Sequence, residues 1–316
     1  MRYTLENDQL KIEVDSFGAE LKSVVSKTTN VSYLWNGDPA FWGRTSPVLF
    51  PFVGSLKDKA YTCKGKTYSM GQHGFARDME HTLLSQSSDA LWFVLKSSEE
   101  TLAKYPYEFI LRIGYILESN TLRVLWEVEN PSEETLPFSI GAHPAFLCPN
   151  PAGDNKEGYQ IFFGKYEAQK PCFLEKQGTI NSHLEQFLPL SAIHHHGNTL
   201  DTGLAISEDL MLPLKDGYTP ITPDFFDRCT YMIEGNQANV VSLVNPKGEA
   251  YVTVYFNTPL FAIWSPEKKN APFVCIEPWF GRCDHVDFQG ELSEREYTNL
   301  LENGKMFCTD YVMQFQ

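Results

Sequence analysis

The sequence has 316 residues, 42% of them hydrophobic and 14% aromatic, and a formal net charge of −14 at pH 7. A chain of this length can bury a large core, whereas an acidic surface repels nucleic acid and anionic lipid, so neither is an expected partner. No segment has the roughly 20 consecutive apolar residues that span a bilayer.

Period-two alternation of apolar residues is the main secondary-structure signal. In chain order it predicts strands over residues 10–14, 91–95, 109–117, 122–128, 240–244 and 251–256. Ser119 and Asn120 predict a turn between the third and fourth strands, which then form a long antiparallel hairpin. Asn245–Gly248 predicts the turn between the last two.

Helix signals are few and short. Residues 99–105 can form one helix, and Ser293 with Glu296 has the form of a capping box that opens one or two helical turns. Strands do not alternate with helices, and glycine-rich nucleotide-binding motifs are absent. Residues 149–223 are poorly periodic and are interpreted as an excursion around the sheets. We predict an all-β, mostly antiparallel fold in a single domain, residues 1–316.

The seven cysteines are scattered and form no Cys-x-x-Cys pair. This spacing fits neither a disulfide framework nor a zinc site. The N-terminus has no apolar signal-peptide core. We therefore expect reduced, buried thiols in a cytoplasmic protein. The expected oligomeric state is a monomer or a homodimer.

Four segments place charged or titratable residues among aromatic, glycine and proline residues: 42–51, 72–77, 141–146 and 275–282. Glu277 follows an apolar run and precedes Pro-Trp-Phe, so it is expected at the buried end of a strand, where a carboxylate needs a partner or its pKa rises. Two readings are open: a structural ion pair with Arg282 or Arg44, or a catalytic base.

His73 and His143 are each flanked by Gly or Pro and a phenylalanine, which places the imidazole at a bend of the chain. Each is either a hydrogen-bonded core residue or part of a site. A carboxylate and an imidazole can together open and close a cyclic aldose by proton transfer, with no metal or redox cofactor. Trp42 and other aromatic residues of these segments can pack on the faces of a sugar.

At these four segments the sequence resembles the aldose 1-epimerase (galactose mutarotase) family, most closely its LacX-like branch. The motifs are Arg-Thr-Ser-Pro-Val-Leu-Phe-Pro from Arg44, His-Gly-Phe-Ala-Arg from His73, His-Pro-Ala-Phe from His143 and Glu-Pro-Trp from Glu277, in the family's order. The resemblance implies a β-supersandwich with an open cleft, and an enzyme that interconverts the α and β anomers of an aldose.

The resemblance also implies roles for individual residues. Glu277 would be the general base at the C1 hydroxyl, His143 the general acid at the ring oxygen, and His73 would hold and polarise the substrate. Arg44 would bind sugar hydroxyls, and Arg77, Phe75 and Trp279 of the same motifs are the other expected substrate contacts. The family places an acidic substrate ligand before the glutamate, and this position falls on Asp227, Asp224 or Cys229.

His194, His195 and His196 form no recognisable zinc motif and are interpreted as a solvated loop. We therefore expect no metal and no cofactor, and a small sugar as the partner. Three other functions are open. A hexose 6-phosphate mutarotase would need a cationic subsite, for which Arg77 or Arg282 can serve. A non-catalytic carbohydrate-binding or regulatory protein would not need an acid/base pair, and a glycoside hydrolase would need a second strong carboxylate.

Overall fold

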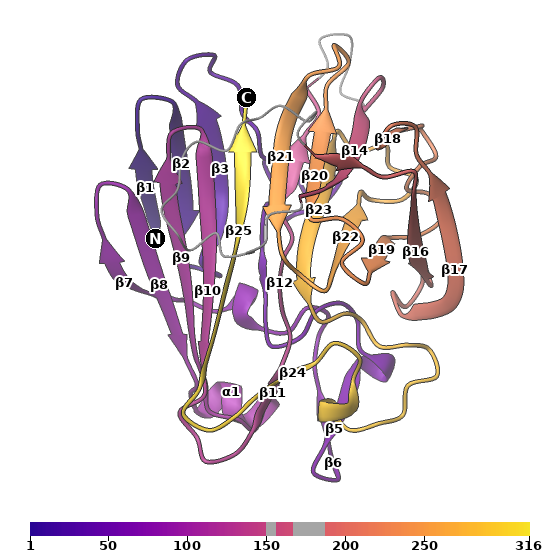
Figure 1. The fold of residues 1–316 in the computed structure, drawn as a ribbon. Helices are drawn as coiled ribbons and strands as arrows, with labels where there is room; N and C mark the ends of the chain where they lie inside the picture. The colour runs from indigo at the N-terminus through magenta and orange to yellow at the C-terminus, as the bar shows by residue number, and fades with distance from the viewer. Residues whose placement is uncertain (150–155, 167–186) are drawn as a thin grey trace.

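The computed structural model describes residues 1–149, 156–166 and 187–316. Strands dominate this part of the chain (Figure 1), and the paired strands run antiparallel, as predicted. In the described residues the helical elements are short: α1 (Glu99–Lys104) and the single 3₁₀ turns η1 (Lys57–Lys59), η2 (Ala76–Asp78) and η4 (Leu292–Glu294). The prediction of an all-β fold is confirmed.

The larger sheet has ten strands. In spatial order they are β15 (Leu188–Pro189), β14 (Gln160–Lys165), β20 (Val240–Val244), β21 (Ala250–Phe256), β25 (Met306–Phe315), β10 (Thr121–Glu129), β9 (Ile110–Glu118), β8 (Ala90–Lys96) and β7 (Thr82–Gln86), with β18 (Tyr218–Pro220) beside β14. The predicted hairpin is confirmed, because β9 pairs with β10 around Ser119 and Asn120.

The second sheet has eight strands and carries the site described below. Its order is β17 (Ala205–Pro213), β16 (Ala192–Asn198), β19 (Tyr231–Glu234), β22 (Leu260–Trp264), β23 (Phe273–Phe280), β12 (Ile140–Ala142) and β4 (Val48–Leu49), with β13 (Ala145–Leu147) also paired to β23. Smaller sheets are β1 (Arg2–Glu6), β2 (Leu10–Asp15) and β3 (Glu20–Ser26); β5 (Ala60–Cys63) and β6 (Lys66–Ser69); and β11 (Leu136–Phe138) and β24 (Asn299–Leu301).

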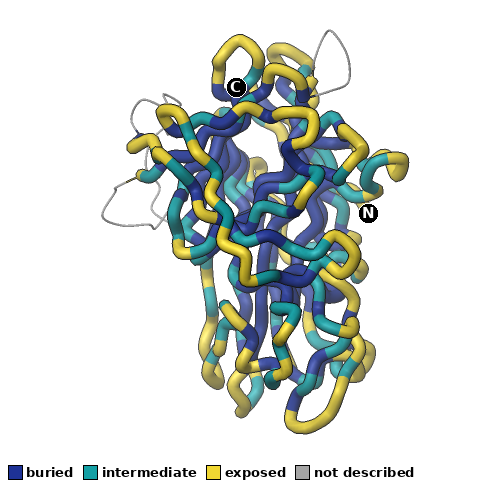
Figure 2. Tube along the Cα trace, turned by 90° about the vertical axis from the view of Figure 1, so that its right-hand side faces the viewer, coloured by how far each residue is buried: buried dark blue, intermediate teal, exposed yellow. Residues whose placement is uncertain are grey.

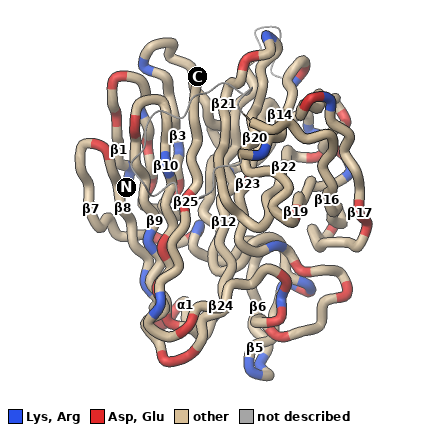
Figure 3. Tube along the Cα trace, viewed as in Figure 1, with Lys and Arg blue, Asp and Glu red and all other residues tan. Residues whose placement is uncertain are grey.

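The main hydrophobic core lies between the two large sheets. It joins Val254 of β21 and Met313 of β25 to Phe261 of β22 and Ile276 of β23, and the rings of Phe256 and Phe261 lie 4.9 Å apart across the interface. Figure 2 shows the strand centres buried and the connecting loops exposed. Lys and Arg are interspersed with Asp and Glu in Figure 3, and no single basic face appears in that view.

Three local interpretations of the sequence are corrected. The histidines at positions 194–196 lie in strand β16 rather than in a loop, because Ile193 and His195 alternate inward and the His195 ring packs 4.5 Å from the ring of Tyr231. The poorly periodic stretch 149–223 lies partly outside the described residues. Much of its described part is strand, since β16 pairs with β17. The turn near Ser293 is one 3₁₀ turn that follows Glu291, and the N–H of Glu291 donates to Oε2 of Glu294 at 2.8 Å.

Two further observations concern the cysteines and membrane-spanning segments. Of the six cysteines in the described residues, all are free thiols; five are buried and Cys308 is exposed. In the described part of the chain, no helix combines the length and the apolar character that crossing a membrane requires.

Candidate active site

Strand β23 brings Glu277 next to His143. It pairs with β12 through Gly141 and Trp279, and with β13 through Ala145 and Cys275. Position 143 therefore falls opposite position 277, at the gap between β12 and β13 where Pro144 interrupts the ladder. The Nε2 atom of His143 lies 3.2 Å from Oε2 of Glu277.

Alternation along β23 decides which side chains reach the site. Val274 and Ile276 point into the main core between the sheets, whereas Glu277 and Trp279 lie on the other face and line a cavity. The period-two pattern that predicts a strand thus also places a carboxylate on the face away from the main core. Even there Glu277 is only 1% exposed, because flanking strands and aromatic side chains cover it.

His73 is fixed at the cavity wall by its backbone. His73 has φ 65° and Gly74 has φ 70°, so the chain makes a left-handed turn. A Cβ atom at position 74 would lie 2.3 Å from the carbonyl oxygen of Phe50, so only glycine fits there. The N–H of Gly54 donates to Nδ1 of His73 at 3.0 Å. The neutral ring therefore carries its proton on Nε2, which can donate to an oxygen in the cavity.

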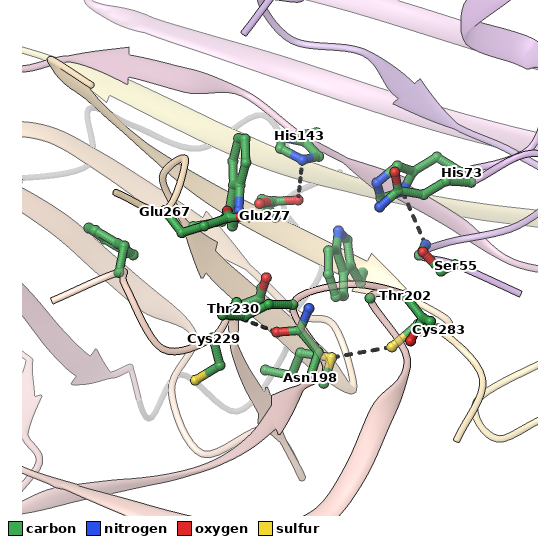
Figure 4. A pocket seen from close by; sticks show the side chains of 18 of the residues that line it. Ser55, His73, His143, Asn198, Thr202, Cys229, Thr230, Glu267, Glu277 and Cys283 are labelled. Carbon is green, nitrogen blue, oxygen red and sulfur yellow. Dashed lines mark hydrogen bonds and ion pairs between the residues drawn. The ribbon is translucent and has the colours of Figure 1, made fainter. Parts of the chain in front are cut away.

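The cavity has a volume of about 360 Å³ and combines aromatic walls with polar groups (Figure 4). The ring of Trp42 stacks on His143 with centroids 4.7 Å apart, and Trp264 meets His143 edge-on at 5.4 Å. Of the expected site residues, Glu277, His143, His73, Arg77 and Trp279 line it. A sugar presents both apolar C–H faces and hydroxyls, and this mixture of groups matches it.

Burial controls the protonation of the pair. The pKa of Glu277 is raised well above its ordinary value by desolvation. The pKa of His143 is lowered to about 3, first by desolvation and then by the positive charge of Arg77. The same two causes hold the pKa of His73 well below its ordinary value. The site thus disfavours isolated charges, and one proton shared between Glu277 and His143 keeps the pair neutral overall.

The expected ion pairs of Glu277 with arginine do not form. Arg44 pairs with Asp78, with Nη2 2.7 Å from Oδ1. Arg282 is buried, pairs with Glu234 and Glu296, and does not line the cavity. Arg44 does not line the cavity, although its charge contributes to lowering the pKa of His143.

Besides Arg44, two expected substrate contacts lie outside the cavity lining. Phe75 is in the main core, with its ring 6.0 Å from that of Phe109, because the left-handed turn at His73 and Gly74 directs the next side chain inward. Asp227 accepts a hydrogen bond from the N–H of Lys268 at 2.7 Å. Asp224 bonds to Thr222, whereas Cys229 does line the cavity.

Sequence reasoning missed several residues that line the cavity. Asn198 and the turn that follows it, which joins β16 to β17, form one wall, and the Asn198 side chain accepts from the N–H of Thr230 at 2.7 Å. Glu267, which precedes two lysines in a turn, lines the cavity together with Trp264. Residues 264–267 have the same mixture of aromatic, proline and charged residues as the four motifs, and that signal could have identified them.

The structure also assembles a ligand set that the sequence does not reveal. In the described residues, ligand atoms of His143, Cys275 and Glu277 all lie within 4.8 Å of one another. A cation would need the thiolate and the carboxylate, and burial raises the pKa of both. A soft divalent cation such as Zn²⁺ suits these donors, but it would occupy both members of the proton-transfer pair.

Comparison with known proteins identifies the family of the chain. The aldose 1-epimerase family model matches residues 1–297. The chromosomal protein LacX of Lactococcus lactis subsp. lactis is 30% identical over 290 residues, covering 89% of this chain and 88% of LacX.

Two solved structures share the fold over the whole chain. A galactose mutarotase related enzyme from Lactobacillus acidophilus has a TM-score of 0.86 and 33% identity, covering 100% of this chain and 97% of that one. A galactose mutarotase-like protein from Lactobacillus casei has a TM-score of 0.84 and 27% identity, with both chains covered completely. The chain belongs to the aldose 1-epimerase family and has the galactose mutarotase-like fold, which supports a role as a carbohydrate epimerase.

Proposed function

We propose that the protein is a mutarotase that interconverts the α and β anomers of an unphosphorylated aldose. The observation that carries the proposal is the buried contact between Nε2 of His143 and Oε2 of Glu277, 3.2 Å long, in a cavity with aromatic walls. The C1 hydroxyl and the ring oxygen of an aldose are bonded to the same carbon. Two adjacent proton-transfer groups can therefore serve both oxygens.

Ring opening needs one proton taken and one given. Glu277 as carboxylate takes the proton of the C1 hydroxyl while protonated His143 gives a proton to the ring oxygen, and the bond between C1 and the ring oxygen breaks. The open-chain aldehyde rotates about its C1–C2 bond. His143 then takes the proton back from the hydroxyl that attacks C1, and Glu277 returns its proton to the carbonyl oxygen.

One proton is shared by Glu277 and His143 throughout this cycle. In the free site the raised pKa of Glu277 and the lowered pKa of His143 hold the proton on Glu277, so the proposal requires the bound sugar to shift it to His143 before ring opening. After opening, the proton is again on Glu277. Both arrangements leave the pair neutral overall, so neither requires an isolated charge in the buried site. His73 donates from Nε2 and steadies the oxygen on which charge develops.

The alternatives are less well supported. A 6-phosphate needs a cation far from C1, but Arg282 is held by Glu234 and Glu296. Arg77 lowers the pKa of both His73 and His143, so it lies near the proton-transfer end. Both carboxylate oxygens of Glu277 are buried and make no well-formed hydrogen bond with a described residue. Burying a carboxylate in this way costs stability, and a protein that only binds sugar gains no proton transfer from it.

An NMR anomer-exchange experiment with purified protein tests the proposal. The panel contains free aldoses and their 6-phosphates at equal concentration, with heat-denatured protein as the control for spontaneous exchange. We expect exchange of at least one free aldose to be accelerated, and more strongly than that of its 6-phosphate. Binding without acceleration would identify a recognition protein, and a preference for the 6-phosphate would favour the phosphosugar alternative.

A further inference from the structure

Besides Glu277, two acidic side chains line the described cavity, Asp201 and Glu267. Asp201 is exposed on the turn between β16 and β17, and its Oδ1 accepts from the N–H of Thr202 at 3.0 Å. Glu267 is half-buried, and no described residue forms an ion pair or a hydrogen bond with its carboxylate. An uncommitted carboxylate that faces a cavity is available to a ligand.

The loop that carries Glu267, residues 265–272 between β22 and β23, is anchored at several points. The ammonium group of Lys156 donates to the hydroxyl of Ser265 at 3.2 Å and to the carbonyl of Ala271. The ammonium group of Lys269 donates to the carbonyl of Phe41 at 3.0 Å. The loop is therefore docked against neighbouring segments, and Glu267 has a defined position relative to the cavity.

Asp227 holds this loop from outside the cavity. Its Oδ1 accepts from the N–H of Lys268 at 2.7 Å, directly after Glu267. Lys268 has φ 56° and Asn270 has φ 45°, left-handed conformations that a non-glycine residue adopts at a cost of about 1 kcal/mol or more. The hydrogen bond from the N–H of Lys268 to Asp227 supports that conformation, so the Asp227 carboxylate acts on Glu267 through the backbone.

The loop begins next to the reactive pair. Trp264, the last residue of β22, meets His143 edge-on at 5.4 Å, and Glu267 follows three residues later. In Figure 4 Glu267 and Glu277 both point into the pocket. A sugar ring that presents C1 to Glu277 and His143 can therefore lie along this aromatic wall with its other hydroxyls toward Glu267.

We infer that Glu267 is the carboxylate that binds sugar hydroxyls in this cavity, and that Asp227 is a positioning residue that holds the Glu267 loop. This inference rests on the proposed function. A carboxylate accepts hydrogen bonds from two neighbouring hydroxyls and repels a phosphate, so it selects an uncharged sugar with free hydroxyls at that end of the ring. Glu267 thus contributes to specificity, whereas Glu277 and His143 carry out the chemistry.

Saturation kinetics of anomer exchange test the role of Glu267. We expect Glu267→Gln to raise KM about 10- to 100-fold, the range for loss of a charge-assisted hydrogen bond, while kcat changes less than about threefold. Monodeoxy aldoses, each of which lacks one hydroxyl, identify the hydroxyls that Glu267 binds. With wild-type protein, one or two of them should show the same increase in KM that Glu267→Gln causes with the complete sugar. With Glu267→Gln, the KM for these deoxy sugars should rise no further. Asp287→Asn, a change to an exposed carboxylate that does not line the cavity, should leave KM within about twofold.

The role of Asp227 is tested by a conservative and a disruptive change. Asp227→Asn keeps an oxygen acceptor for the N–H of Lys268 and should retain wild-type KM. Asp227→Ala should raise KM, and should add little when combined with Glu267→Gln, because both act on one contact. Asp224→Asn is the matched control, since Asp224 bonds to Thr222 and does not line the cavity. An equal loss with Asp227→Asn, or full additivity, would mean that Asp227 touches the sugar itself and would overturn its positioning role.

A binding measurement separates failure of this inference from failure of the proposed function. Trp42, Trp264 and Trp279 line the cavity, so quenching of tryptophan fluorescence by free aldose reports affinity without turnover. Weaker binding by Glu267→Gln supports the inference even if wild-type protein does not accelerate exchange. If wild-type protein is active and Glu267→Gln binds and turns over sugar like wild type, the inference is overturned and the proposed function stands.

Discussion

His143 lies opposite Glu277 in the antiparallel register of β12, β13 and β23, between the pairs Gly141–Trp279 and Ala145–Cys275. The residues are 134 positions apart in the sequence, yet their side chains meet at 3.2 Å. Backbone pairing on both sides of the gap holds this contact, so the relative position of the two groups depends on the sheet rather than on flexible loops.

The first prediction concerns the assigned base and acid. Glu277→Gln keeps the size of the side chain but removes the base, and should lower the rate of anomer exchange by about 10²-fold or more. His143→Asn should do the same by removing the acid. Affinity for the sugar, measured by fluorescence quenching, should change much less in both variants. Asp287→Asn, at an 87% exposed side chain, is the control. Near wild-type exchange by Glu277→Gln would contradict the mechanism.

The second prediction concerns the pH dependence of exchange. Burial lowers the pKa of His143 to about 3 and raises that of Glu277, so the pair keeps one shared proton across neutral pH. The profile of kcat/KM should be flat through pH 6.5, the ordinary histidine pKa, and should fall only well below and well above it. A single ionisation near pH 6.5 in the profile would show that His143 titrates as an exposed histidine and not as a member of the buried pair.

The third prediction concerns stability. Burial lowers the pKa of His81 to about 4, so between about pH 4 and 6.5 the unfolded chain binds a proton that the folded chain does not. This contribution to stability is fully present above pH 6.5 and is lost as the pH falls toward 4. His81→Gln should reduce the slope of unfolding free energy against pH in this window by about 1.4 kcal/mol per pH unit.

Urea unfolding at a series of pH values measures that slope. His194→Gln is the matched control, because the side chain of His194 is 57% exposed. The two variants should differ in slope even if both lower stability at every pH. An unchanged slope in His81→Gln would mean that His81 titrates normally in the folded protein.

The fourth prediction concerns metal ions. Proton transfer between Glu277 and His143 needs no cation in the proposed mechanism, so activity should survive exhaustive dialysis against EDTA. Added Zn²⁺ should inhibit by binding His143, Cys275 and Glu277, and Cys275→Ser should weaken that inhibition. Activity that is lost with EDTA and restored by a divalent ion would assign the three side chains to a functional metal site instead.

Sequence alone determined the fold class and pointed to Glu277 and His143. Period-two alternation predicts the hairpin of β9 and β10 and the strands β20 and β21, because a strand with one buried face imposes that pattern whatever its partners are. The resemblance of four short motifs to the aldose 1-epimerase family singles out His73, His143 and Glu277, each of which stands among glycine, proline and aromatic neighbours.

Only the tertiary structure decided which charged residues face the cavity. Arg44 and Arg282 form ion pairs, Phe75 lies in the core, and Asp227 accepts a hydrogen bond from the backbone of Lys268. Glu267, which lies outside the four motifs, lines the cavity instead. The direction of a loop side chain depends on long-range anchors such as Lys156 and Asp227. Lys156 contacts Ala271, 115 positions away, and Asp227 contacts Lys268, 41 positions away. Hydrophobic periodicity reports only local structure, so contacts between residues this far apart cannot be predicted from it.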